Sequence, residues 1–307
     1  MSELESVALI SSKTPQSGIF LEGFQHMYFL EYQLSSEDDS LVKRAIAQSL
    51  IADKVEVVVS FGHAAWQRLQ PCWTPATLAP FTTINGEQGH RAPSTQTDVF
   101  FWLQGHDIGD VFDQAVQIQV AMQPVAKLML EERGFDYHHE MDLIGFEDGS
   151  ANPKTDQLKH NAAVIPKGQL GEGGSLVLSQ KWVHNLPKWN QVSVHAQEKV
   201  VGRTKDENIE LEGAAMPDDS HISRTDLNVD GVAMKIYRRS APFGGVKKNG
   251  LLFLAFGCEL IRFSSQLESM YGLTEDKKID QLLNYSTAVS GSYWFAPALE
   301  DLAEILQ

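Results

Sequence analysis

Apolar and polar side chains recur along the first half of the chain with the spacing of strands and helices. Every second position from Tyr28 to Leu34 is apolar, and the same period of two returns from Val55 to Phe61. A nearly continuous apolar stretch around residue 100 predicts a central strand. The predicted elements are strands within 18–34, 55–61, 98–104 and 128–137 and helices at 41–50, 64–69 and 107–122. Their order predicts a ferredoxin-like unit.

The second half repeats this order of elements, although no repeat is visible in the amino-acid sequence. Its predicted strands lie at 175–182, 232–240 and 250–257, its predicted helices lie at 187–200 and 261–270, and residues 292–296 form either a closing strand or a loop. We therefore expect an α+β protein of two ferredoxin-like domains, residues 1–144 and 145–307. Each domain should have an antiparallel sheet with helices on one face, in the manner of a dimeric α+β barrel.

A compact turn is predicted between the two halves. Two glycines and an Asn-Pro pair within residues 142–153 favour tight bends over a helix or a strand. Turns that join domains often carry functional groups. Asp148 lies in this turn between Phe146 and Gly149. Its carboxylate either caps the turn, which is the commoner role, or is a functional group held in partly apolar surroundings.

Composition and charge narrow the classes of function. The chain has 307 residues, of which 43% are hydrophobic, and this suits a folded protein of two domains. A net charge of −15 argues against a nucleic-acid or anionic-membrane partner. Cys72 and Cys258 lie far apart in apolar surroundings, as buried free thiols do in a reducing compartment. The acidic N-terminus resembles no export signal, so we expect a cytoplasmic protein.

One arginine lies where the pattern predicts a buried side chain. In the predicted strand 232–240, the apolar residues of one face reach Ile236, and Arg238 is the next residue of that face. A guanidinium at the end of an apolar row is costly unless an anion or a polar ligand meets it. Arg238 and Asp148 together would form an acid/base group beside a fixed cation, a pair that peroxide or oxyanion chemistry can use.

His221 precedes this strand in a polar loop, and its role has two interpretations. A solvent-exposed histidine is the commoner one, and a metal ligand is the alternative. The cluster at 138–140 has more metal-binding residue types, but adjacent histidines diverge and no spacing of a known metal site occurs. Arg203 and Lys205 follow a predicted helix end, where cations are common because of the helix dipole. The sharper alternative is that they neutralise an anionic ligand.

Three linked motifs resemble the dye-decolourising (DyP-type) family of haem peroxidases. Gly-Phe-Glu-Asp-Gly at 145–149 is similar to the GxxDG motif of that family. The Gly-Arg-Thr-Lys segment at 202–205, the Ser220-His221 pair and the run from Arg238 to Gly244 match the family in order and spacing. The resemblance covers nearly the whole chain and favours the compact bacterial branch. Chlorite dismutases share the architecture, but the GxxDG turn and the tandem domains favour the dye-decolourising branch.

The resemblance implies a dimeric ferredoxin-like fold with haem b in the C-terminal half. The roles that it implies are those of His221 as iron ligand, Asp148 and Arg238 as the distal pair, Arg203 as partner of a haem propionate, and Ser240 in a distal position where some relatives have asparagine. A carboxylate that hydrogen-bonds to His221 would tune the haem. The resemblance does not assign this carboxylate, and Asp226 and Asp230 are the candidates.

The activity that the resemblance implies is oxidation of dyes, phenols and other organic donors by hydrogen peroxide through a ferryl intermediate, in a homo-oligomer. A haem-binding or haem-handling protein with incidental peroxidase activity is a second hypothesis, and a tandem ferredoxin-like binding module without haem is a third. Bulky donors would not reach a haem buried between two domains. Electrons would then enter at the haem edge or through exposed members of the six tryptophans and seven tyrosines.

Overall fold

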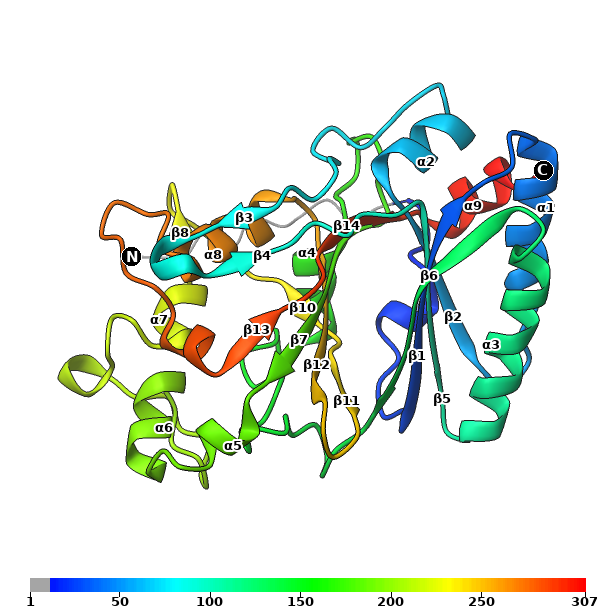
Figure 1. Cartoon of the computed structure of the whole chain (residues 1–307). Coiled ribbons are helices and arrows are strands. Elements are labelled where there is room, and N and C mark those ends of the chain that lie inside the picture. Colours follow the sequence, from blue (N-terminus) through cyan, green and yellow to red (C-terminus); the bar gives the residue numbers. More distant parts are fainter. Residues whose placement is uncertain (1–11) are drawn as a thin grey trace.

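Both halves of the chain contribute strands to one continuous sheet. The computed structural model describes residues 12–307, and the acidic N-terminus, for which we expected no export signal, lies outside them. Figure 1 shows most of the first half, in blue to teal, on one side of the molecule and most of the second half on the other, while the cyan segment at residues 84–92 lies beside the second half. No helix among residues 12–307 is long and apolar enough to cross a membrane.

The first half folds largely as its pattern predicts. Its elements are β1 (His26–Leu34), α1 (Asp39–Ser49), β2 (Glu56–Phe61), α2 (His63–Leu69), β3 (Ile84–Asn85), β4 (Arg91–Ala92), β5 (Val99–Gly105), α3 (Ile108–Met122) and β6 (Ala126–Phe135). Tyr28 and Tyr32 on β1 are buried on the face that α1 and α3 cover (Figure 1). Asp38 begins α1 because its carboxylate accepts hydrogen bonds from two backbone amides of the first turn.

The second half contains more short elements than its pattern predicts. They are α4 (Asp156–Ala163), β7 (Ser175–His184), α5 (Leu186–Trp189), α6 (Val194–Val201), α7 (His221–Thr225), β8 (Asn228–Val229), β9 (Val232–Ala233), β10 (Tyr237–Arg238), β11 (Ala241–Gly244), β12 (Asn249–Gly257), α8 (Ile261–Met270), β13 (Ser286–Ala288), β14 (Ser292–Ala296) and α9 (Leu299–Ile305). The predicted helix at 187–200 is two helices: α5 ends at Trp189, and α6 begins after Ser193, whose hydroxyl accepts a hydrogen bond from the amide of Ala196. The helix α4 was not predicted.

The predicted strand 232–240 is wrong as a single element. Only its ends, β9 and β10, are strands, and residues 234–236 run between them without a partner strand. Side chains of α8 replace that partner: Gln266 donates a hydrogen bond to the carbonyl of Met234, and Arg262 donates one to the carbonyl of Lys235, both at 2.7 Å. The backbone is thereby satisfied while the segment bends away from the sheet.

Eight strands close into a barrel. Hydrogen-bonded neighbours follow the order β12-β11-β6-β1-β5-β2-β14-β7, and β7 pairs with β12 again, while β10 and β13 lie at the edges of β12 and β7. The two seams between the halves are narrow, since Phe243 pairs with Gly134 and Phe295 pairs with Phe61 as single residue pairs. A Cβ atom on Gly134 would lie 2.7 Å from that of Ala241, so glycine permits the close approach at the first seam.

A buried carboxyl group lies inside the barrel. Trp294 Nε1 donates a hydrogen bond to the hydroxyl of Ser179 at 2.9 Å, and this hydroxyl donates to Glu31 at 3.3 Å. Burial raises the pKa of Glu31 to about 8, because the apolar interior disfavours the charged form. Glu31 is therefore mostly protonated at neutral pH.

Candidate active site

A large cavity lies between the outer face of the second-half sheet and the helices that stand against it. Its empty volume is about 1410 Å³, including the part open to solvent. Within the described chain, all of its lining residues belong to positions 142–286. Only Asp142 and Ile144 precede the predicted domain boundary, so the cavity lies almost wholly in the second domain and not between two domains, where we expected the haem to be buried. Its apolar lining includes Leu178 and Trp182 of β7, Leu251 and Phe253 of β12, and Ile236 and Met270.

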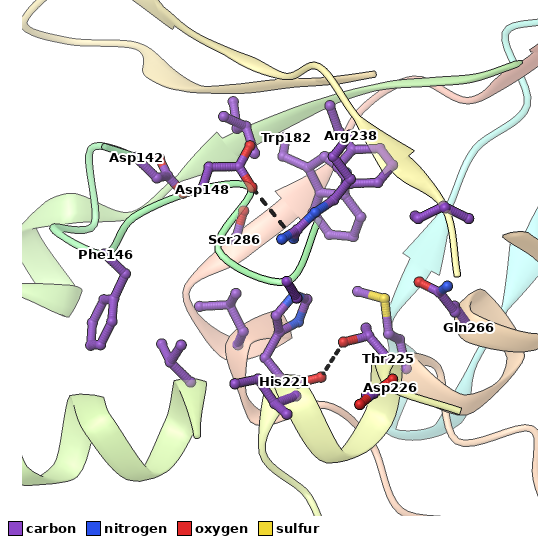
Figure 2. A pocket seen from close by; sticks show the side chains of 18 of the residues that line it. Asp142, Phe146, Asp148, Trp182, His221, Thr225, Asp226, Arg238, Gln266 and Ser286 are labelled. Atoms are coloured by element: carbon purple, nitrogen blue, oxygen red, sulfur yellow. Dashed lines mark hydrogen bonds and ion pairs between the residues drawn. The ribbon is translucent and has the colours of Figure 1, made fainter. Parts of the chain in front are cut away.

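His221 points into this cavity from the first turn of α7 (Figure 2). The helix starts here because the hydroxyl of Ser220 accepts a hydrogen bond from the amide of Ser223 at 3.3 Å. Arg224, on the same short helix, forms two hydrogen bonds to the carboxylate of Asp276, at 2.7 and 3.2 Å. His221 is thus held on an anchored helix and not in the polar loop that the sequence indicated.

Asp280 is the carboxylate that hydrogen-bonds to His221. Its Oδ2 lies 2.6 Å from Nδ1 of the imidazole, and its side chain is 0% exposed. Its second oxygen accepts a hydrogen bond from the amide of Leu282 at 2.8 Å, which fixes the carboxylate at the start of a short 3₁₀ turn. Because a carboxylate only accepts, Nδ1 carries the proton and Nε2 is left to face the cavity.

The two candidates from the sequence are not this partner. Asp226 pairs with Lys235, and Asp230 lies in the turn between β8 and β9 with a φ of 51°. Asp280 comes 59 residues after His221, so no local spacing connects the two. The signal that could have found it is weak: a lone aspartate directly before a short 3₁₀ turn that the sequence pattern does not predict.

Asp148 and Arg238 meet on the other side of the cavity. Oδ1 of the carboxylate lies 3.4 Å from Nη1 of the guanidinium, and the two side chains are 18% and 19% exposed. Figure 2 shows this pair facing the imidazole of His221 across the open space. The structure therefore brings together the three residues that the sequence singled out, from a turn, from β10 and from α7. The arrangement places a proton acceptor and a fixed cation opposite a free imidazole nitrogen.

The turn that carries Asp148 is clamped to the strand that carries Arg238. The side-chain amide of Asn152 donates to the carbonyl of Arg238, and the amide of Arg238 donates back to the side chain of Asn152, both at 2.9 Å. Gly145 and Gly149 have φ values of 84° and 79°, which other residues rarely adopt. The glycines of the GxxDG motif thus shape the turn, and Asn152 fixes its place.

Arg203 and Ser240 do not line the cavity. The guanidinium of Arg203 donates to the carbonyl of Asn208 at 2.8 Å and to Glu210 at 3.2 Å, and Glu210 itself does line the cavity. The hydroxyl of Ser240 accepts a long hydrogen bond, 3.4 Å, from the amide of Leu254. Arg203 is thus one side chain away from the cavity wall, and Ser240 is engaged with β12.

The structure also bears on two other expectations, those for the aromatic residues and for the histidine cluster at 138–140. All six tryptophans and all seven tyrosines lie within the described residues, and each is buried or only partly exposed. Trp73, Tyr137 and Tyr285 are partly exposed and stay candidate entry points for electrons, whereas the other ten are buried. Residues 138–140 are exposed with positive φ values, as expected of a solvated end. Between residues 12 and 307, no three or more His, Cys, Asp or Glu side chains lie close enough together to hold a metal ion.

Comparison with known proteins gives matches along nearly the whole chain. Residues 16–136 match the model of the N-terminal part of Dyp-type peroxidases, and residues 139–301 match that of the C-terminal part. The chain is 34% identical over 254 residues to the dye-decolorizing peroxidase of Mycobacterium tuberculosis, which covers 81% of this chain and 75% of the relative. It is 31% identical over 268 residues to that of Rhodococcus erythropolis, covering 86% and 78%.

Solved structures agree with these matches. A dyp-type peroxidase protein of Shewanella oneidensis superposes with a TM-score of 0.89 at 30% identity, covering 96% of this chain and 99% of the other. A variant of DypB from Rhodococcus jostii, in complex with heme, superposes with a TM-score of 0.88 at 29% identity, covering 95% and 99%. The chain therefore belongs to the Dyp-type peroxidase family and is a dye-decolorizing peroxidase, an oxidoreductase that acts on peroxide.

Proposed function

We propose that this peroxidase binds haem b in the cavity through His221 and activates hydrogen peroxide with Asp148 and Arg238. The observation that carries the proposal is their arrangement, with the imidazole on one side of the cavity and the carboxylate–guanidinium pair on the other. The heme in the Rhodococcus jostii DypB structure supports the same cofactor here. The location of the cavity supports a C-terminal haem domain, and we place the boundary between the two domains at residues 144 and 145.

The side chains around the cavity fit a haem group. The bond from Nδ1 of His221 to Asp280 leaves Nε2 as the nitrogen that would hold the iron, and a buried carboxylate behind the ligand increases its electron donation. The apolar side chains of β7 and β12 offer a surface on which the macrocycle would lie. Arg203 is the proposed partner of a propionate, since its contact Glu210 lines the cavity, and Ser240 is a proposed distal contact.

Bound haem supplies the iron that takes up peroxide and the oxidising equivalents that donors later consume. Asp148 accepts the proton that peroxide must lose and returns it to the departing oxygen. Arg238 stabilises the negative charge that develops on oxygen as the O–O bond breaks. Asn152 holds the turn that carries Asp148 against the strand that carries Arg238, and this keeps the two side chains 3.4 Å apart.

The remaining parts of the proposal concern donors, assembly and location. We propose that dyes and phenolic compounds are the organic donors, that electrons enter at the haem edge, and that the protein works as a cytoplasmic homo-oligomer. Ten of the thirteen tryptophan and tyrosine side chains, all within residues 12–307, are buried, and this supports entry at the edge. The alternative of a haem-handling protein with incidental activity has no structural feature in its favour.

The test has two steps. Wild-type protein supplemented with haem should give a Soret band with the features of histidine ligation, and His221→Ala should lose them. In stopped-flow mixing with peroxide, Asp148→Asn and Arg238→Leu should each slow the first spectral change, by about 10²- to 10³-fold. Asp226→Asn is the control, because this carboxylate also lines the cavity but pairs with Lys235. Unchanged rates in both distal variants would refute the assignment and favour the haem-handling protein.

A further inference from the structure

A second histidine lines the cavity, and both of its ring nitrogens are engaged. His184 is the last residue of β7, and its side chain is 3% exposed. Its Nε2 lies 3.0 Å from Oδ1 of Asp142, and its Nδ1 lies 2.8 Å from the hydroxyl of Ser286 on β13. Since a carboxylate only accepts, Nε2 donates to Asp142 and the Ser286 hydroxyl donates to Nδ1 of the neutral ring.

Asp142 stands at the base of the turn that carries Asp148. Its amide donates to the carbonyl of Phe146 at 2.8 Å, and its carbonyl accepts from the amide of Gly145 at 2.8 Å, which closes the first loop of the turn. The Asp142 side chain is 11% exposed. A carboxylate so deeply buried needs a hydrogen-bond partner, and within the described residues Nε2 of His184 donates to it at 3.0 Å.

The turn is therefore attached to the sheet on two sides of Asp148. Before Asp148, the bond between Asp142 and His184 ties the turn to β7. After Asp148, the two bonds of Asn152 tie it to β10. A carboxylate that transfers a proton must stay within a few tenths of an ångström of its working position, and a turn held at one end only would let it move.

We propose that His184 is a positioning residue of this peroxidase: by holding Asp142 at the base of the turn, it fixes the Asp148 carboxylate against Arg238. This inference rests on the proposed function in so far as Asp148 is the proton acceptor. His184 itself needs no contact with peroxide, since its two nitrogens are occupied by Asp142 and Ser286.

The first experiment measures the turn directly, in protein with and without haem. In hydrogen–deuterium exchange, peptides covering residues 142–153 should exchange about 10-fold faster in His184→Leu than in wild type. His184→Gln places an amide donor near Nε2 and should restore most of the protection. His160→Leu is the matched control, a half-buried histidine on α4 that does not line the cavity. Equal exchange in His184→Leu and wild type would overturn the proposal.

A second variant keeps the test valid if His184→Leu does not fold. Asp142→Asn retains a carbonyl acceptor but loses the charge, so exchange in the same peptides should rise by a smaller factor, about 3-fold. No rise in Asp142→Asn would count against the proposal in the same way. A rise of equal size in the His160→Leu control would also overturn it, because the effect would then be general destabilisation.

The second experiment is a double-mutant cycle on the peroxide reaction. His184→Leu should slow the first spectral change after mixing with peroxide by about 10- to 100-fold, and His184→Gln should recover most of that loss. In an Asp148→Asn background, His184→Leu should have little further effect, because the residue being positioned is gone. Additive losses would overturn the proposal. If Asp148→Asn alone is harmless, the proposed function fails, whereas the exchange experiment still decides whether His184 holds the turn.

Discussion

Replacing Asp280 by asparagine should raise the reduction potential of the bound haem by about 60 to 130 mV. The carboxylate lies 2.6 Å from Nδ1 of His221 with its side chain 0% exposed, so water does not screen the bond. A buried hydrogen bond to a charged group contributes about 1.5 to 3 kcal/mol. The negative charge favours the oxidised iron, and asparagine removes it while keeping the size of the side chain.

The conversion to a potential follows from the one-electron couple. A difference of about 1.4 kcal/mol corresponds to about 59 mV, which gives the range above if the whole bond energy is lost from the oxidised state. The assay is a spectroelectrochemical titration of the Soret band in wild type and variant. The control is Asp226→Asn, because Asp226 also lines the cavity but pairs with Lys235 and not with His221.

Two results would refute this reasoning. A potential of Asp280→Asn equal to that of wild type would mean that Asp280 does not tune the ligand. A shift of the same size and sign in the Asp226→Asn control would mean that any nearby charge changes the reduction potential by long-range electrostatics. The hydrogen bond to Nδ1 would then have no special role.

Three further predictions concern Glu31 inside the barrel, the bond between Asn152 and Arg238, and the anchoring of α7 by Arg224. Burial raises the pKa of Glu31 from 4.5 to about 8. Between pH 4.5 and pH 8 the folded protein therefore binds more protons than the unfolded chain. The free energy of unfolding should fall by up to about 5 kcal/mol as the pH rises from 4.5 to 8. Glu31→Gln should abolish that slope in denaturant titrations, and an unchanged slope would contradict it. Asn152→Ala removes the clamp between the turn and Arg238 and should slow the reaction with peroxide about 10-fold in stopped-flow without loss of the Soret band; an unaltered rate would argue against the clamp. Arg224→Met frees α7 from Asp276, whose side chain is 43% exposed, and should destabilise the protein by about 1 to 2 kcal/mol and weaken haem binding. Chemical unfolding and haem titration measure the two effects, and unchanged values in both would show that the helix needs no anchor.

The sequence predicted the parts of the fold that depend on local periodicity. The strands β1 and β2 follow from alternation, β5 follows from its continuous apolar stretch, and α3 (Ile108–Met122) follows from helical spacing with one face buried. The broken segment at 232–240 could not be predicted in this way. Its alternation is real, since Met234, Ile236 and Arg238 all line the cavity, but side chains of α8 take the backbone bonds that a strand would make.

The same distinction holds for the site. Asp148, Arg238 and His221 were found because each breaks a local rule or belongs to a motif. Asp280 and His184 were missed because their roles depend on contacts across 59 and 42 positions of the chain. Nothing in the residues around either one distinguishes it from a turn aspartate or from a histidine that ends a strand.

The confinement of the cavity wall to residues 142–286 has a consequence for how such an enzyme can change. None of residues 12–141 lines the cavity, so substitutions there leave the side chains of its wall unchanged. If donors react at this cavity, new donor preferences are expected from substitutions within residues 142–286. A mutant library aimed at other dyes is therefore best directed at the lining positions in that range, with residues 12–141 kept constant.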